Sequence, residues 1–310
     1  MTTFFRIAAF SLILLGLTTI SFAQDKGKKD ENFLKIAKLA NSKKPEDQDK
    51  GYAMGKDFIA AYGKDADDKV KKIKDFVNGY EFNKLNSLLD TGKTDEAFLL
   101  GKDILERNPD DVYTAMNLAY GGYDALIKRK DDSFGGDSIT YAKQTLTFFE
   151  KGTLPKTFSP FKNQNDATAW MYVIVGNFTE DFDSKEAAVN YYNALKNDSE
   201  LKSQAQLYVS IANYYEKVYE QMAKDYKFKH GSKQNEDAEM KADNVKIDAV
   251  LDRMIDSYAR VVKIAEAEKH SNLENFKARY IQIYKFRKKS DAGANELLNT
   301  VLSTSMPMPN

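Results

Sequence analysis

The chain has 310 residues, of which 42% are hydrophobic and 30% are charged, enough for one large domain or an extended array of repeats. Lysine plus arginine and aspartate plus glutamate each number 46, so the charge balance argues against nucleic acid or an anionic membrane as a partner. Cysteine is absent, which excludes disulfide bonds, a thiol nucleophile, a thiolate metal site and a lipid anchor attached through cysteine.

Residues 1–23 have the pattern of a secretory signal peptide. Arg6 supplies a positive charge, residues 7–20 form an apolar run, and small residues precede a cleavage site after Ala23. The alternative is a transmembrane anchor, but a helix over this run would measure about 21 Å, shorter than a hydrocarbon core of about 30 Å. We therefore expect an exported protein, periplasmic or secreted, with no lipid anchor and no membrane insertion after cleavage.

Beyond a short charged linker at residues 24–32, the pattern is helical as far as residue 305. Apolar residues recur three and four positions apart, whereas the alternation typical of strands is scarce. The six prolines lie at the edges of these segments, where proline is tolerated: Pro45, Pro109, Pro155, Pro160, Pro307 and Pro309. The fold class is therefore all-α, and residues 306–310 form a tail.

A helical segment with a small or apolar residue at its start recurs with a period near 45 residues. Its copies lie at 51–59, at 97–105, and from Ala142, Ala187, Val250 and Ala294. The copy at Val250 fits only if a charged insertion at 226–243 precedes it. Each copy follows another amphipathic segment, and two such helices can bury their apolar stripes by pairing and stacking. The sequence predicts an α-solenoid of about six antiparallel helix pairs.

The motifs within these pairs resemble the tetratricopeptide repeat family. The first-helix pattern of that family is matched by Tyr208-x2-Ile211-Ala212-x2-Tyr215 and in part by Trp170-x2-Val173-Ile174. The second-helix pattern, a small residue followed by a terminal proline, is carried by Ala97 and Pro109. Two departures are the longer period, since the family repeats every 34 residues, and Gly101, which replaces a bulky aromatic residue. HEAT-type repeats, with periods of about 40–47 residues, are the alternative helical array.

The resemblance implies that the first helices line a concave surface where a partner peptide binds. The residues at matching positions, together with Trp170 as an aromatic groove residue, are Asn83, Lys84, Asn117, Trp170, Asn177, Asn213 and Tyr214. Asparagine side chains can bond an extended peptide backbone on both sides. Tyrosines between residues 191 and 226 also exceed what one apolar stripe can bury, and tyrosine is well suited to interfaces.

No catalytic or metal-binding motif stands out. Of the two histidines, His230 is placed by its charged surroundings in a solvated loop, and His270 lies at a helix junction. We therefore predict a non-enzymatic protein-protein interaction or scaffold protein, without metal or cofactor, which binds an unidentified protein or peptide and no nucleic acid. The alternative is an exported glycan or small-molecule binding protein that uses groove aromatics such as Trp170. Polar outer faces on the end repeats would favour a monomer.

Overall fold

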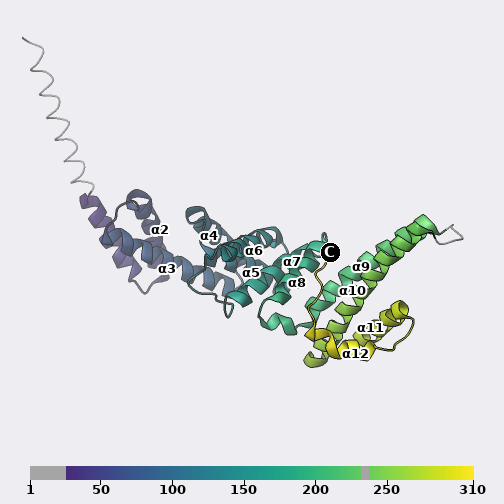
Figure 1. Cartoon of the computed structure of the whole chain (residues 1–310). Helices are drawn as coiled ribbons and strands as arrows, with labels where there is room; N and C mark the ends of the chain where they lie inside the picture. Colours follow the sequence, from purple (N-terminus) through teal and green to yellow (C-terminus); the bar gives the residue numbers. More distant parts are fainter. Residues whose placement is uncertain (1–25, 232–236) are drawn as a thin grey trace, which may run out of the picture. The chain divides into compact units, whose positions relative to one another are not determined.

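The computed structural model describes residues 26–231 and 237–310, and every regular element in those ranges is an α-helix or a short 3-10 helix (Figure 1). The predicted signal peptide lies outside the described residues. The chain divides into two compact units, the first ending at Leu100 and the second running from Gly101 to Asn310, so that the boundary falls inside α4 (Thr94–Arg107). None of the described helices is both long enough and apolar enough to cross a membrane.

The first unit contains a helix over residues 26–40, then α2 (Pro45–Tyr62) and α3 (Asp68–Asp90). Pro45 begins α2, where a missing N–H group costs nothing. The side chain of Asp67 caps α3 by accepting a hydrogen bond from the Val70 amide at 2.9 Å. The three helices enclose a small core of Ile36, Phe58, Val70, Ile73 and Val77.

The predicted linker at 24–32 is helical from residue 26 onward. Its charges are paired with a distant part of the same unit: Nζ of the buried Lys29 lies 2.5 Å from carboxylate oxygens of both Asp65 and Asp67. These two hydrogen bonds, the one to Asp65 being the stronger, raise the pKa of the Lys29 amine. The high charge density therefore reflects ion pairing across the unit, which the linear sequence does not reveal.

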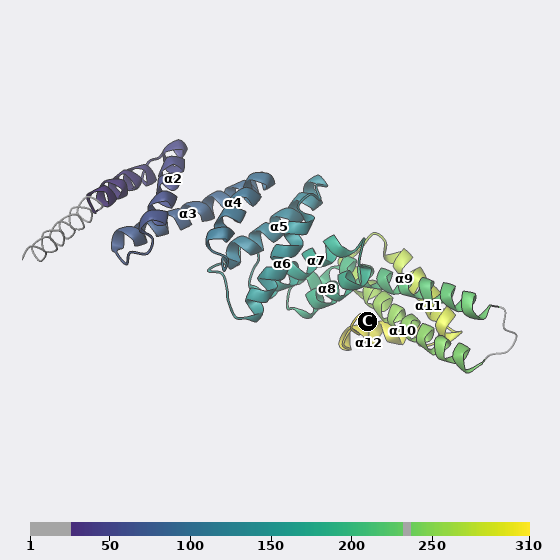
Figure 2. The ribbon, with the colours of Figure 1, turned by 90° about the horizontal axis from the view of Figure 1, so that it is seen from above.

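The second unit continues the helical array through eight further helices within the described residues. They are α5 (Val112–Arg129), α6 (Gly135–Glu150), α7 (Gln164–Thr179), α8 (Ser184–Lys196), α9 (Ala205–His230), α10 (Ala238–Glu268), α11 (Leu273–Lys288) and α12 (Ala294–Thr300), with 3-10 turns at Glu200–Ser203 and Val301–Ser303. From α5 to α11 each helix packs on the next in chain order, and α12 packs on α10 (Figure 2). This sequential packing confirms the predicted all-α solenoid.

The pairs α5–α6, α7–α8 and α9–α10 pack together as predicted, whereas α12 packs on α10, and the spacing of the predicted pairs is uneven. The second helices of the pairs begin at residues 45, 94, 135, 184, 238 and 294, so successive starts are 41 to 56 residues apart. The longest intervals follow from α9 and α10, which are 26 and 31 residues long. As predicted, α4 ends just before Asn108-Pro109, and Gly92, with φ of 72°, reverses the chain ahead of α4.

Close packing explains why Gly101 stands where a bulky residue was expected. A Cβ atom on Gly101 would lie 2.5 Å from a methyl carbon of Leu118, which belongs to α5 and is fully buried. The space that an aromatic ring would fill on α4 is therefore occupied by a side chain from the next helix.

The predicted insertion at 226–243 is largely helical in its described residues, 226–231 and 237–243, and His230 is not in a solvated loop. Helix α9 continues to His230 and α10 begins at Ala238, so both helices extend beyond the neighbouring pairs. His230 is 2% exposed, its ring lies tilted against that of Tyr226 with the centroids 4.8 Å apart, and its Nε2 lies 3.1 Å from Oδ2 of Asp243. His230 is therefore buried between the two long helices. Its hydrogen-bond partner, Asp243, comes from α10, which the linear sequence does not place beside it.

Candidate functional site

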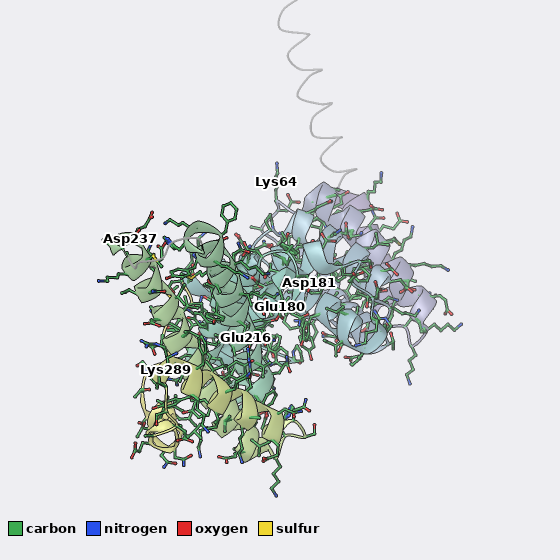
Figure 3. All side chains as sticks on the ribbon, turned by 90° about the vertical axis from the view of Figure 1, so that its right-hand side faces the viewer. Lys64, Glu180, Asp181, Glu216, Asp237 and Lys289 are labelled. Atoms are coloured by element: carbon green, nitrogen blue, oxygen red, sulfur yellow. The ribbon has the colours of Figure 1, made fainter. Side chains whose placement is uncertain are left out.

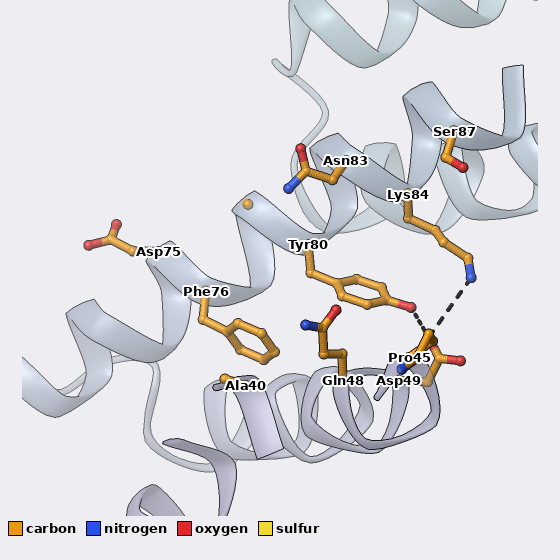
Figure 4. A pocket seen from close by; sticks show the side chains of 11 residues that line it. Ala40, Pro45, Gln48, Asp49, Asp75, Phe76, Tyr80, Asn83, Lys84 and Ser87 are labelled. Atoms are coloured by element: carbon orange, nitrogen blue, oxygen red, sulfur yellow. Dashed lines mark hydrogen bonds and ion pairs between the residues drawn. The ribbon is translucent and has the colours of Figure 1, made fainter. Parts of the chain in front are cut away.

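An open groove of about 480 Å³ runs between α2 and α3 in the first unit (Figure 4). Its lining residues are Ala40, Pro45, Gln48, Asp49, Asp75, Phe76, Gly79, Tyr80, Asn83, Lys84 and Ser87. Asn83 and Lys84 were both predicted from the sequence as partner-binding residues. The groove therefore brings these two together, with aromatic and acidic neighbours that the prediction did not include.

The polar groups of the groove are held in place by one another. The hydroxyl of Tyr80 donates a hydrogen bond to Oδ1 of Asp49, and Nζ of Lys84 lies 3.8 Å from the same oxygen. Burial, together with this hydrogen bond, raises the pKa of Tyr80. The Tyr80 ring stacks on Tyr52 with a centroid distance of 4.5 Å. The ring of Tyr80 is therefore held in one position at the side of the groove, whereas the side chain of Asn83 is exposed.

The groove is elongated along α3. The α3 residues that line it extend from Asp75 to Ser87, which corresponds to about 18 Å of helix. An extended peptide of five or six residues has about the same length. On the facing helix, Gln48 uses Nε2 to donate to the Ser42 carbonyl at 2.8 Å, an arrangement that orients its amide. The elongated shape and the amide groups of Gln48 and Asn83 in the lining suit an extended chain better than a compact small molecule.

A second, larger hollow in the first unit has a different character. It has a volume of about 650 Å³ and lies beside Lys29, Lys69, Asp65 and Asp67. These four side chains are engaged in ion pairs, Lys29 with Asp65 and Asp67, and Lys69 with Asp30 at 2.5 Å. Because these pairs hold the 26–40 helix against α3, we assign this hollow a structural role.

The structure places Asn117, predicted as a groove residue, inside the second unit. Its side chain is 4% exposed, and Nδ2 donates hydrogen bonds to the carbonyl oxygens of Tyr113 at 3.0 Å and Ser159 at 3.2 Å. The second bond fastens the loop between α6 and α7 to α5. Asn117 therefore stabilises the fold and does not belong to an exposed binding surface.

Trp170 lies half-buried in an aromatic cluster on α5 and α7. Its ring meets those of Tyr120 and Tyr123 edge-on, with centroid distances of 5.9 and 5.8 Å. The ring of Phe161 packs against Tyr120 from the other side. The indole thus contributes to the packing between neighbouring helices.

The other predicted residues of the second unit are spread over two helices. Asn177 is half-buried on α7. Asn213 is exposed on α9. Tyr214 is 5% exposed, and its hydroxyl donates to the main-chain oxygen of Asn310 at 2.7 Å. Of these, Tyr214 contacts an extended segment of chain.

Among the tyrosines between residues 191 and 226, Tyr191, Tyr208 and Tyr214 are buried with their hydroxyls bonded inside the molecule, and Tyr258 on α10 is held in the same way. Tyr191 donates to Glu180 and Tyr258 donates to Glu216, both at 2.8 Å, and both glutamates are labelled in Figure 3. Glu216 also accepts a hydrogen bond from Nε of Arg279 at 2.7 Å, which links α9, α10 and α11. Each helix of a stacked array has neighbours on more than one side, so it buries more aromatic area than a single stripe suggests.

One cluster within the described residues has the composition of a metal site. His230, Asp237 and Glu239 can each place a ligand atom within 4.8 Å of the others. The ammonium group of Lys229 already lies 2.8 Å from Glu239 and 2.9 Å from Asp243. Since this lysine supplies a positive charge at the same place, the cluster is accounted for as an ion-pair network that joins the tips of α9 and α10.

Comparison with known proteins finds no matching family model, no similar curated protein and no similar solved structure.

The groove residues that sequence reasoning missed include Gln48 and Asp49 on α2 and Asp75, Phe76 and Tyr80 on α3. The sequence does hold a signal for the residues of α3. Phe76, Tyr80 and Asn83 are spaced four and three residues apart, so they are expected to share one face of a helix. The α2 residues could not be found in this way, since their position depends on how α2 packs against α3.

Proposed function

We propose that this chain is an exported, non-enzymatic interaction protein of the tetratricopeptide-like type, which binds an extended segment of a partner protein. The observation that supports the proposal best is the open groove between α2 and α3, in which Asn83 and Lys84 lie beside the fixed ring of Tyr80. The export part rests on the signal-peptide pattern of residues 1–23.

The groove offers a peptide three kinds of contact. The exposed Asn83 amide can donate to and accept from a peptide backbone. Phe76 and Tyr80 provide aromatic surface for one or two side chains, and Asp75 provides a negative charge at one end (Figure 4). A partner segment with a basic residue next to an apolar residue matches this order.

The proposal can be tested with a substitution that fills the groove without harming the fold. Gly79 lies on α3 in the groove lining, and a Cβ atom there would meet nothing within 4 Å. Gly79→Leu should therefore stabilise the helix by about 0.5–1 kcal/mol, because glycine is a poor helix former, while its side chain occupies the groove.

The measurement uses a photo-crosslinking amino acid at position 83 in the native host, with the same amino acid at the exposed Lys64 as the control position. We expect a specific crosslinked protein from position 83 only, and we expect Gly79→Leu to remove it while raising the melting temperature. A crosslink that survives Gly79→Leu would mean that the groove is not the binding site.

Mass determination of the exported chain should give a mature protein that begins at Gln24.

A further inference from the structure

The segment 304–310, which includes the predicted tail at 306–310, lies extended across the second unit and is bonded to it. It follows the 3-10 turn Val301–Ser303 and has no regular secondary structure of its own. In Figure 1 the yellow end of the chain leaves the region of α12 and runs back along α10 toward α9. Met306 packs against the hydrophobic core of the unit, and Pro309 is buried.

Three side chains of α9 and α10 hold this segment by its main-chain oxygens. Arg260 donates from Nη2 to the Thr304 oxygen at 3.1 Å, and Arg253 donates from Nη1 to the Met308 oxygen at 2.9 Å. Tyr214 donates to the Asn310 oxygen at 2.7 Å. All three groups supply hydrogens to the main chain of 304–310.

The donors are positioned in advance by the fold. Arg260 is 4% exposed, and Asp256 on the previous helical turn accepts hydrogen bonds from its Nε at 2.8 Å and its Nη2 at 3.3 Å. Tyr214 is buried against Tyr215, with ring centroids 5.2 Å apart. A guanidinium group fixed in this way loses little side-chain entropy when it binds a carbonyl group.

The spacing of the donors matches an extended peptide. Arg253 and Arg260 are two turns apart on α10, which corresponds to about 10.5 Å. The carbonyl groups that they bind, at Thr304 and Met308, are about 12–13 Å apart in an extended or polyproline conformation. The two arginine side chains are long enough to bridge the small difference between their own spacing on α10 and the spacing of the two carbonyl groups.

The composition of the segment complements these donors. Pro307 and Pro309 have no N–H group, so this part of the segment offers carbonyl acceptors and apolar rings. The receptor surface offers donors and aromatic rings. Recognition of proline-containing extended peptides depends on this combination.

We propose that the surface formed by Tyr214, Arg253 and Arg260 is a binding site for an extended, proline-containing peptide segment, which residues 304–310 occupy as an internal competitor. A partner segment of the same chemistry binds by displacing residues 304–310. A tethered segment has an effective concentration in the millimolar range, so it weakens the apparent affinity for a competing peptide. The site is independent of the groove between α2 and α3.

The test uses the full chain and a labelled synthetic peptide, Ser-Thr-Ser-Met-Pro-Met-Pro-Asn, which corresponds to residues 303–310. A released variant carries Met306→Asp and Pro309→Asp, which place charges where the segment is buried. We expect saturable binding of the peptide to the released variant, measured by fluorescence anisotropy, and binding at least about tenfold weaker to the unchanged chain.

The specificity of the site is tested within the released variant. Adding Arg253→Gln and Tyr214→Phe should weaken binding at least about tenfold, because two of the three donors are lost. Lys217→Gln, an exposed change on α9, should leave it unchanged. Absence of saturable binding to a folded released variant, or binding that is indifferent to the Arg253 and Tyr214 changes, would overturn the proposal.

A second measurement does not need the released variant. In the unchanged chain, the methyl NMR signal of Met306, which packs against the hydrophobic core, should move toward the position of an exposed methionine when unlabelled peptide is added at a few millimolar, which is about the effective concentration of the tethered segment. A Met306 signal that does not move under that condition would also overturn the proposal.

Discussion

A Cβ atom placed on Gly176 of α7 would lie 2.8 Å from Cε1 of Tyr191 on α8. The tyrosine ring has little freedom to withdraw, because it is 2% exposed and its hydroxyl donates a hydrogen bond to Glu180 at 2.8 Å. Contact between the glycine backbone and the flat ring therefore sets the spacing of these two helices.

Gly176→Ala should consequently destabilise the second unit, although alanine is the better helix former. We expect a loss of about 1–3 kcal/mol in the free energy of unfolding, measured by urea denaturation, from overpacking against Tyr191. The matched control is Gly136→Ala on α6, where a Cβ atom meets nothing within 4 Å. That change should be neutral or stabilising by up to about 1 kcal/mol. Equal effects of the two substitutions would contradict the packing argument.

Asn117→Asp should be more harmful than its small change in size suggests. The Asn117 amide donates to two main-chain oxygens, whereas an ionised carboxylate has no hydrogen to donate and would face both oxygens. We expect Asn117→Ala to cost about 1–3 kcal/mol in unfolding free energy and Asn117→Asp to cost more at neutral pH. If both variants unfold at the same urea concentration as the unchanged chain, the buried position of this residue is wrong.

The ion-pair network at the tips of α9 and α10 should be sensitive to acid. Lys229, and then His230 and Lys246, form hydrogen bonds that lower the pKa of Asp243, while Glu239 competes for Lys229. Because the pKa of Asp243 is lower in the folded chain than in the unfolded chain, its carboxylate stabilises the fold. This contribution is fully present at pH values above the unfolded-state pKa of about 3.9, and it is lost as the pH falls through the folded-state pKa.

The variant Asp243→Asn should therefore melt at a lower temperature than the unchanged chain at neutral pH, and the difference should narrow below about pH 4. Asp181→Asn provides the control, because Asp181 is exposed and its carboxyl is labelled in Figure 3 away from this network. A difference in melting temperature that stayed constant from about pH 7 to about pH 2 would show that Asp243 is not the group responsible.

Trp170 is the only tryptophan, so its fluorescence reports on the aromatic cluster directly. Because its ring packs edge-on against Tyr120 and Tyr123, we expect Trp170→Ala to cost about 2 kcal/mol of stability and Trp170→Phe to cost less. Titration with oligosaccharides should leave the emission unchanged. Saturable quenching by a sugar would instead support the alternative function of glycan binding.

The fold class and the order of the helices could be predicted from the sequence alone. Apolar spacing identifies the helices, and prolines such as Pro45 and Pro109 mark their ends, because both signals depend on a few neighbouring residues. The resemblance to tetratricopeptide repeats nominated Asn83 and Lys84 as partner-binding residues, and both line the groove between α2 and α3, so their role in binding stays a prediction.

Only the tertiary structure decided which polar groups are buried. Lys29, Asn117 and His230 look solvent-exposed or partner-binding in the linear sequence, yet each is bonded to a group from a distant segment. The same holds for residues 304–310, whose carbonyl groups meet Arg253 and Arg260 some fifty residues earlier in the chain. Helical periodicity depends on neighbours along the chain, whereas burial of a polar group depends on a partner that packing brings to it.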